Sequence, residues 1–175
     1  TPLLVADLRL APITEVLDSL RKKEGIQQLV SYQLIPVLGK PVYQVRALSN
    51  TSSGMNEQAK RVERSFLVNA STGIIRPPLE KEEAIEVARE QFSAPATVQE
   101  VRLLTETDSH HEYRNNPLPA YAIRFNHPSR TIVYVSTELG TVQKFRNDKW
   151  RIFDFMWMLH TMDYKGRDDF GNKLL

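Results

Sequence analysis

Two pairs of similar segments, far apart in the chain, constrain its fold more than any other feature of the sequence. The segment PVYQVR at residues 41–46 is similar to PAYAIR at residues 119–124. Downstream of each lies a second pair, FLVNASTGII at residues 66–75 and VYVSTELGTV at residues 133–142. In both longer segments an apolar strand pattern leads into a turn at a glycine, which tolerates the positive φ of tight hairpins. The similarity predicts two units of one fold in tandem.

An amphipathic helix pattern precedes the strands of each unit. Apolar residues recur at helical spacing in PITEVLDSLRKKEG, residues 12–25, and in LEKEEAIEVAREQF, residues 79–92. Pro12 suits a first helical position and Gly25 suits the residue just past the helix end. The predicted buried stripes consist of Ile13, Val16, Leu17 and Leu20 in the first helix and Ala84, Ile85, Ala88 and Phe92 in the second.

Each unit is therefore expected to contain a helix followed by three strands, with room for a short fourth. The boundaries are residues 12–76 and 79–146, separated by two prolines. A long polar loop at residues 49–61 in the first unit and another at residues 106–118 in the second disguise the similarity. The economical fold is α+β, with one helix laid over each antiparallel sheet. Because each core is small, we expect the units to share an interface or to pair edge to edge.

The composition limits the classes of function. The chain of 175 residues is long enough for one ordinary domain or two small ones. Its formal net charge is only +2 and it has no run of lysine and arginine, so we expect no nucleic-acid partner. The lack of cysteine excludes disulfides, thiolate zinc sites and cysteine nucleophiles. No nucleophile elbow, Walker loop, zinc-protease motif or dinucleotide fingerprint occurs in the sequence, so we expect a non-enzymatic protein.

The helix, the strand with the pattern P-x-Y-x-[VI] and the later strand ending in a glycine turn together resemble the PepSY domain. The resemblance covers residues 12–76 and again residues 79–146. The tail WRIFDFMWMLHTMDYKGRDDFGNKLL, residues 150–175, is similar to the segment that follows the domain in bacterial PepSY-containing inner-membrane proteins, just before a transmembrane helix. The resemblance implies a periplasmic, extracytoplasmic domain of a bacterial inner-membrane protein, acting as a binding or peptidase-inhibiting module without established catalytic residues.

The two ends of the chain fit this implication. The sequence begins at Thr1 without a methionine, and its last residues, Leu174 and Leu175, resemble the start of an apolar run. No stretch of the chain is long and apolar enough to span a bilayer. We therefore expect a piece of a longer protein, anchored in the membrane by helices outside this sequence.

Residues 149–175 are predicted to form a membrane-proximal tail that begins as an apolar helix. If residues 152–159 are helical, both faces of the helix are apolar. Two interpretations follow: the helix packs on the second sheet, or it contacts a membrane surface or a partner, for which tryptophan is well suited. The candidate contact residues are Trp150, Phe153, Met156, Trp157 and His160.

Polar residues at two places in the sequence are candidate ligand sites. His110 and His111, with Asp108 and Glu112, are the only group similar to a metal site, but their spacing is poor and a solvated loop is favoured. We therefore expect no metal and no cofactor. The tail also carries a polar cluster that would bind a cation or partner, or form an ion-paired turn at the helix end, which is the favoured interpretation. The cluster consists of Asp163, Arg167, Asp168 and Asp169.

Taken together, the sequence predicts a binding module that takes a peptide or a protein at a sheet edge or in a groove between the units. Regulation of a protease is the version that the PepSY resemblance implies. The alternative is an accessory domain of a membrane redox system, of the iron or siderophore reductase kind, in which His160 would matter. We expect the ring of His160 to be enclosed by Phe153, Met156 and Trp157 rather than to bind haem.

Overall fold

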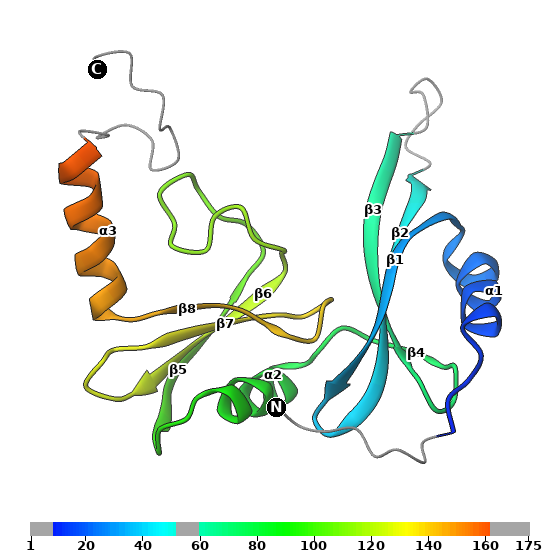
Figure 1. Cartoon of the computed structure of the whole chain (residues 1–175), viewed down its shortest axis with the longest axis horizontal. Helices are drawn as coiled ribbons and strands as arrows, with labels where there is room; N and C mark the ends of the chain where they lie inside the picture. The colour runs from blue at the N-terminus through cyan, green and yellow to red at the C-terminus, as the bar shows by residue number, and fades with distance from the viewer. Residues whose placement is uncertain (1–8, 52–59, 162–175) are drawn as a thin grey trace.

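The computed structural model of the chain describes residues 9–51 and 60–161, which form three helices and two four-stranded antiparallel sheets (Figure 1). The α+β class is therefore confirmed. The strand orders are β1-β2-β3-β4 in the first sheet and β5-β6-β7-β8 in the second. The first part consists of α1 (Ile13–Glu24), β1 (Ile26–Val37), β2 (Lys40–Thr51), β3 (Lys60–Asn69) and β4 (Ile75–Arg76). The second consists of α2 (Lys81–Gln91), β5 (Thr97–Leu104), β6 (Ala120–Asn126), β7 (Ile132–Ser136), β8 (Val142–Arg146) and α3 (Asp148–Thr161).

The two amphipathic helices form where the sequence predicts them. In α1 the side chains of Val16 and Leu20 are fully buried against the first sheet, and Gly25 ends the helix at a φ of 64°. Pro12 is the N-cap residue rather than the first helical residue, a shift of one position. At the start of α2, the side chain of Glu83 accepts a hydrogen bond from the backbone N–H of Glu80, at 3.3 Å.

The loops of the two parts differ, as expected, although one is shorter than the sequence indicates. The segment between β5 and β6 contains the predicted loop at residues 106–118. The predicted loop at residues 49–61 is wrong at both ends, because β2 continues to Thr51 and β3 begins at Lys60. Residues 49–51 and 60–61 therefore belong to paired strands rather than to the loop.

The two sheets meet by packing, and the expected alternative of edge-to-edge pairing is wrong. One face of the first sheet contacts α1, and its other face supplies Val37, Val42 and Leu67 to a core shared with α2 and the second sheet. The side-chain amide of Gln44 donates a hydrogen bond to the carbonyl of Leu139, at 2.6 Å. The β7–β8 turn thus lies against a sheet face rather than beside an edge strand.

Gly140 makes this close approach feasible. Its φ is +68°, and a Cβ at this position would lie 3.0 Å from Leu67 and 3.3 Å from Val37. Both neighbours are almost completely buried, so they have little room to move away. A glycine is therefore needed for both the backbone conformation and the space.

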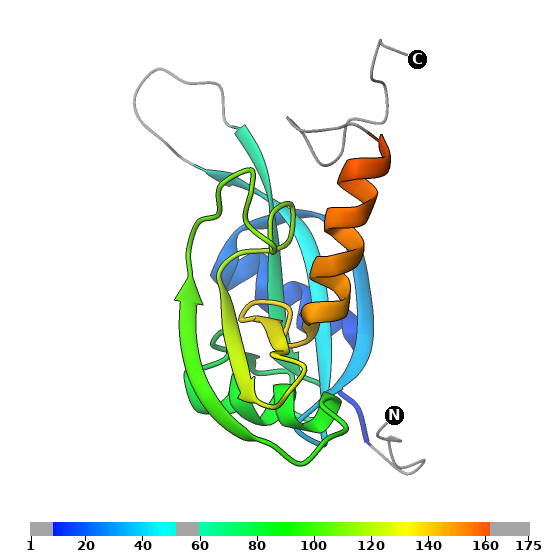
Figure 2. The same cartoon turned by 90° about the vertical axis from the view of Figure 1, so that its left-hand side faces the viewer.

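The helix α3 stands apart from both sheets, and the interpretation that its apolar residues pack in the core is wrong. Figures 1 and 2 show that it projects from the end of β8. Because only its base approaches the second sheet, it covers no sheet face. No helix in the described part of the chain is long and apolar enough to cross a membrane. Its exposed large apolar residues are Trp150, Ile152, Phe153, Phe155, Met156, Trp157 and Leu159.

Candidate functional site

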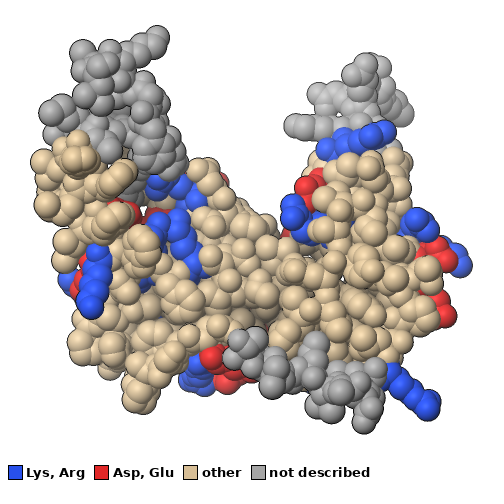
Figure 3. All heavy atoms as spheres, in the orientation of Figure 1, with Lys and Arg blue, Asp and Glu red and all other residues tan. Residues whose placement is uncertain are grey.

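A groove of about 660 Å³ lies between β8, the C-terminal part of α2 and the β1–β2 hairpin. In the orientation of Figure 1, β8 runs from the base of α3 to the middle of the molecule, and the same region in Figure 3 shows Lys and Arg side chains to the left and uncharged surface toward the middle. The groove is lined by apolar and polar side chains, and its charged residues are Glu90, Lys144 and Arg146. We call it the β8 groove; it is lined by Ile35, Pro36, Leu38, Val87, Glu90, Gln91, residues 140–146 and Trp150.

The wall that β8 contributes is the edge of a strand rather than a face. Side chains of consecutive strand residues point to opposite faces of a sheet. All the residues of β8 line the groove nevertheless, so the outer edge of the strand faces it. Among the described strands, β8 pairs only with β7. An edge strand of this kind offers backbone N–H and C=O groups to a further strand.

Arg146 lies where β8 ends and the groove meets α3. Its side chain is half-buried, and its guanidinium carbon lies 5.6 Å from the centre of the Trp150 ring. The Nε atom of Arg146 is screened from solvent and has no hydrogen-bond partner within the described structure. A guanidinium nitrogen can only donate, so this atom requires an acceptor. The end of the groove thus carries a cation with an unused donor.

A second cleft, of about 620 Å³, lies on the face of the second sheet opposite the shared core. We call it the charged cleft; its charged and histidine residues are Glu100, Arg102, Asp108, His110, His111, Glu112, Arg124, Arg130, Asp148 and Arg151. Its arginines all form ion pairs. Glu100 pairs with Arg102 at 2.7 Å and lies 3.8 Å from Arg124.

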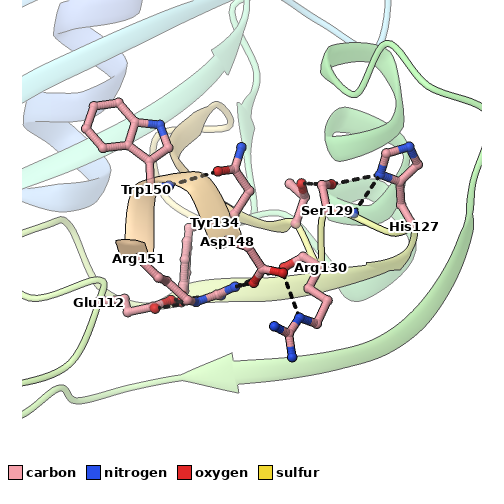
Figure 4. Close-up of polar contacts among 10 residues, drawn as sticks. Glu112, His127, Ser129, Arg130, Tyr134, Asp148, Trp150 and Arg151 are labelled. Carbon is pink, nitrogen blue, oxygen red and sulfur yellow. Dashed lines mark hydrogen bonds and ion pairs between the residues drawn. The ribbon is translucent and has the colours of Figure 1, made fainter. Parts of the chain in front are cut away.

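The other two arginines of the charged cleft hold the base of α3 (Figure 4). Arg151 donates two hydrogen bonds to the carboxylate of Glu112, at 2.7 and 3.2 Å, and one to Asp148 at 3.0 Å. Asp148 also accepts a hydrogen bond from Arg130, at 2.8 Å. Hydrogen bonds from Arg130 and then Arg151 hold the pKa of the Asp148 carboxyl below its usual range.

Trp150 lies in the first turn of α3, between the ion-paired residues Asp148 and Arg151. The backbone N–H of Trp150 donates to the side chain of Asn147, at 3.1 Å, which caps the first turn of α3. Figure 4 shows the Trp150 ring directed away from the side chain of Arg151 and its contact with Glu112. The charged cleft therefore fixes the helix base from one side, and the Trp150 ring closes the end of the β8 groove on the other.

Two stacked tyrosines form the floor beside the charged cleft. The rings of Tyr113 and Tyr134 lie 4.8 Å apart and nearly parallel, and the hydroxyl of Tyr113 donates to the carbonyl of Pro117. Burial, and then the nearby charge of Glu112, raise the pKa of Tyr134 to about 12. Burial also raises the pKa of Tyr113. Both hydroxyls therefore stay protonated near neutral pH, where they pack and donate hydrogen bonds.

The candidate contact residues of the sequence fall into two places. Trp150 lines the β8 groove. Phe153, Met156, Trp157 and His160 lie exposed along α3, beyond the groove. The expectation that His160 is enclosed by its neighbours is wrong: its ring is exposed and lies 5.9 Å from that of Trp157. The polar cluster of Asp163, Arg167, Asp168 and Asp169 lies outside the described residues.

The histidine pair in the loop at residues 106–118 takes part in local turns. The carboxylate of Asp108 accepts a hydrogen bond from the backbone N–H of His110, at 2.8 Å. Nδ1 of His111 accepts one from the backbone N–H of Tyr113, at 3.0 Å. Within residues 9–51 and 60–161, no group of three His, Cys, Asp or Glu side chains is placed to hold a metal ion.

Sequence reasoning missed Arg146 as a site residue and Glu112 as the partner of Arg151. The position of the strand at residues 142–146 as the last strand of its sheet could have marked an edge. Nothing in the sequence pairs Arg151 with a carboxylate 39 positions earlier, or shows that the Nε of Arg146 has no acceptor in the part of the chain that the structure describes. These two facts depend on the packing of separate loops and helices.

Comparison with known proteins adds little to this geometry. No family model and no curated protein matches the chain. A solved structure, that of a candidate lipoprotein from Clostridium difficile 630, is similar at 17% sequence identity with a TM-score of 0.32. The match covers 84% of this chain and 99% of the other. The function is therefore argued from the two clefts and α3.

Proposed function

We propose that this protein is a non-catalytic module that binds an extended peptide by adding it as a strand beside β8. The observation that carries the proposal is the exposure of the whole edge of β8 in a groove of about 660 Å³. Strand addition supplies affinity through backbone hydrogen bonds, and side-chain pockets supply selectivity. The apolar walls at Ile35, Leu38 and Val87 suit the apolar side chains of such a peptide.

The chemistry of the charged cleft supports a role in binding or architecture rather than catalysis. Its four arginines all contact carboxylates, and the buried tyrosines beside it stay protonated at neutral pH. A general acid or base works best when its pKa lies near the operating pH. The carboxyl of Asp148, whose pKa is lowered, and the hydroxyl of Tyr134, whose pKa is raised, both move away from that range.

Amide hydrogen exchange tests the proposal. The peptide is first selected by the protein from an array of random sequences of about eight residues, which lies within the usual range of strand lengths. Because strand addition pairs backbone groups, exchange should slow in β8 when the peptide is added. The matched control is β5, the opposite edge of the same sheet. The proposal would be contradicted if exchange slowed in β5 but not in β8. It would also be contradicted if no peptide of the array bound to the protein.

The proposed setting is extracytoplasmic, at a bacterial inner membrane, in a PepSY-like protein in which the two sheets with their helices are tandem units. The identical strand order of the two sheets and the helix before each support the tandem arrangement. The PepSY resemblance at residues 41–46 and 119–124 supports the family. Within that family, regulation of a protease through a bound peptide segment is the version that fits the β8 groove.

We propose that the exposed apolar residues of α3 contact the lipid surface in this setting, because tryptophan and phenylalanine favour the membrane interface. Flotation with vesicles of phosphatidylethanolamine and phosphatidylglycerol tests this contact. A variant with Phe155→Ser and Trp157→Ser should float less than the unchanged protein. The control carries Val30→Ser and Tyr32→Ser, which remove comparably exposed apolar residues from β1. Equal flotation of both variants would argue against the contact.

The alternative proposal, an accessory domain of a membrane redox system, depends on His160. A haem ligand lies in an apolar pocket that holds the macrocycle, whereas His160 lies on the exposed surface of α3. We expect haem titration of the protein to give no Soret band. Stoichiometric haem binding that is lost in His160→Ala would favour the redox alternative over the peptide-binding module.

A further inference from the structure

We infer that the peptide in the β8 groove carries an aspartate or glutamate side chain that binds Arg146. The inference rests on the proposed function and adds to it a chemical class of ligand. Acidic residues on an added strand would lie beside the last residue of β8, where the groove ends at Trp150. The recognition would combine backbone pairing along the strand with one charged contact at its end.

Arg146 differs from the arginines of the charged cleft on the same sheet. Those four arginines contact carboxylates, at distances from 2.7 to 3.8 Å. Arg146, by contrast, has a screened Nε without an acceptor in the described part of the chain. Because this Nε is screened from solvent, an incoming carboxylate would approach the terminal nitrogens of the guanidinium, which form strong charge-assisted hydrogen bonds with carboxylates.

The surroundings of Arg146 prepare it for such a contact. Its guanidinium lies 5.6 Å from the centre of the Trp150 ring, which restricts the side chain before any ligand arrives. Lys144, two residues earlier on β8, lies on the same face of the strand and adds a second positive charge. Glu90 is the acidic residue that lines the same groove, so the lining is positive overall. This charge favours an acidic peptide over a basic one.

The register of β8 also limits where the acidic residue can lie. Arg146 pairs with Ile132 and Lys144 pairs with Tyr134, so both cations lie on the sheet face that carries the charged cleft. Side chains of an added strand alternate between faces. Acidic residues of the peptide should therefore occur at one position or at two positions separated by one residue, with apolar residues between them directed toward the core side of the sheet.

Binding measurements on pairs of peptides test this inference. The probes are peptides selected from the random array and their counterparts in which each acidic residue is replaced by its amide. For the unchanged protein, the acidic peptide should bind about tenfold or more tightly than the amide peptide. In Arg146→Gln this preference should disappear. Arg102→Gln, which removes an exposed arginine of the charged cleft, should keep it.

The outcomes separate the inference from the function on which it rests. Equal affinity of acidic and amide peptides for the unchanged protein would overturn the inference and leave the peptide-binding proposal standing. The absence of any selected peptide would overturn both. A preference that survives in Arg146→Gln but disappears in Arg102→Gln would place the acidic contact in the charged cleft and would also overturn the inference. The comparison of acidic and amide peptides uses the unchanged protein. A folding defect in Arg146→Gln therefore cannot hide the preference for the acidic peptide.

Discussion

The β8 groove and the charged cleft belong to the same sheet and have similar volumes, about 660 and 620 Å³, yet they differ in what they leave unsatisfied. In the charged cleft the arginines meet carboxylates of their own chain. In the groove a strand edge is open and the Nε of Arg146 has no acceptor within the described structure. Size and charge alone therefore do not mark a binding site. Unused hydrogen-bonding capacity distinguishes the two.

The two regions are nevertheless connected through the base of α3. Arg151 and Asp148 fix the first turn of the helix from the side of the charged cleft. The neighbouring Trp150 closes the groove on the other side. The ion pairs thus shape the groove indirectly, whereas the packing of the two sheets shapes it directly. Variants can separate these two contributions.

The largest loss of stability is expected from filling the space at Gly140, where the β7–β8 turn contacts the first sheet. Gly140→Ala places a Cβ about 3.0 Å from the buried Leu67 and forces an alanine to a φ of +68°. The free energy of unfolding, measured with urea, should fall by about 2–4 kcal/mol. The matched control is Gly39→Ala, with a φ of +70° and no atom within 4 Å of the new Cβ, which should cost only about 1–2 kcal/mol. Equal losses would show that the sheet contact is not tight.

A smaller loss is expected from opening the ion-pair network of the charged cleft. Arg151→Ala removes two hydrogen bonds to Glu112 and one to Asp148. Because the pair is partly buried, the free energy of unfolding should fall by about 1–2 kcal/mol. Arg130→Ala removes a far more exposed partner of Asp148 and should cost less than about 1 kcal/mol. If both variants cost the same, the network would not anchor α3 through Glu112.

The smallest expected effect is a pH dependence of the stability of the first turn of α3. The folded protein holds the pKa of Asp148 below its usual range, chiefly through Arg130. The resulting stabilisation is present above the usual pKa of an aspartate and is lost as the pH falls through the lowered value. The fluorescence of Trp150 should therefore change in acid as the base of α3 loosens. Asp148→Asn should lack this acid transition; an unchanged transition would assign it to another carboxylate.

The local elements could be predicted from the sequence because their signals are local. The stripe of Val16 and Leu20 and the αL position of Gly25 follow from spacing and from the conformational freedom of glycine. The arrangement of the sheets could not be predicted, because the contact of Gly140 with Leu67 joins segments far apart in the chain. An apolar helix pattern also does not say what covers it, and for this reason α3 was placed in the core by one interpretation although it lies exposed.

The sequence predicted the type of place where a candidate site lies, but only one of the residues discussed for the β8 groove, Trp150. The sequence predicted a sheet edge or a groove between two helix-and-sheet parts, and the β8 groove combines an open strand edge with residues of the first sheet. The sequence predicted Trp150 as a contact residue because it is an aromatic residue at the start of the predicted tail. Arg146 could not be chosen, since the lack of an acceptor for its Nε within the described residues depends on tertiary packing that the sequence does not show.

The most direct test of the account is a crystal structure of the protein with its tightest peptide from the random array. The account predicts the peptide as an additional strand beside β8, with a carboxylate of the peptide on the guanidinium of Arg146 and apolar side chains toward Val87 and Leu38. The charged cleft should keep its ion pairs between Arg151 and Glu112. A peptide bound against Tyr134 in the charged cleft, with the edge of β8 left open, would contradict the account.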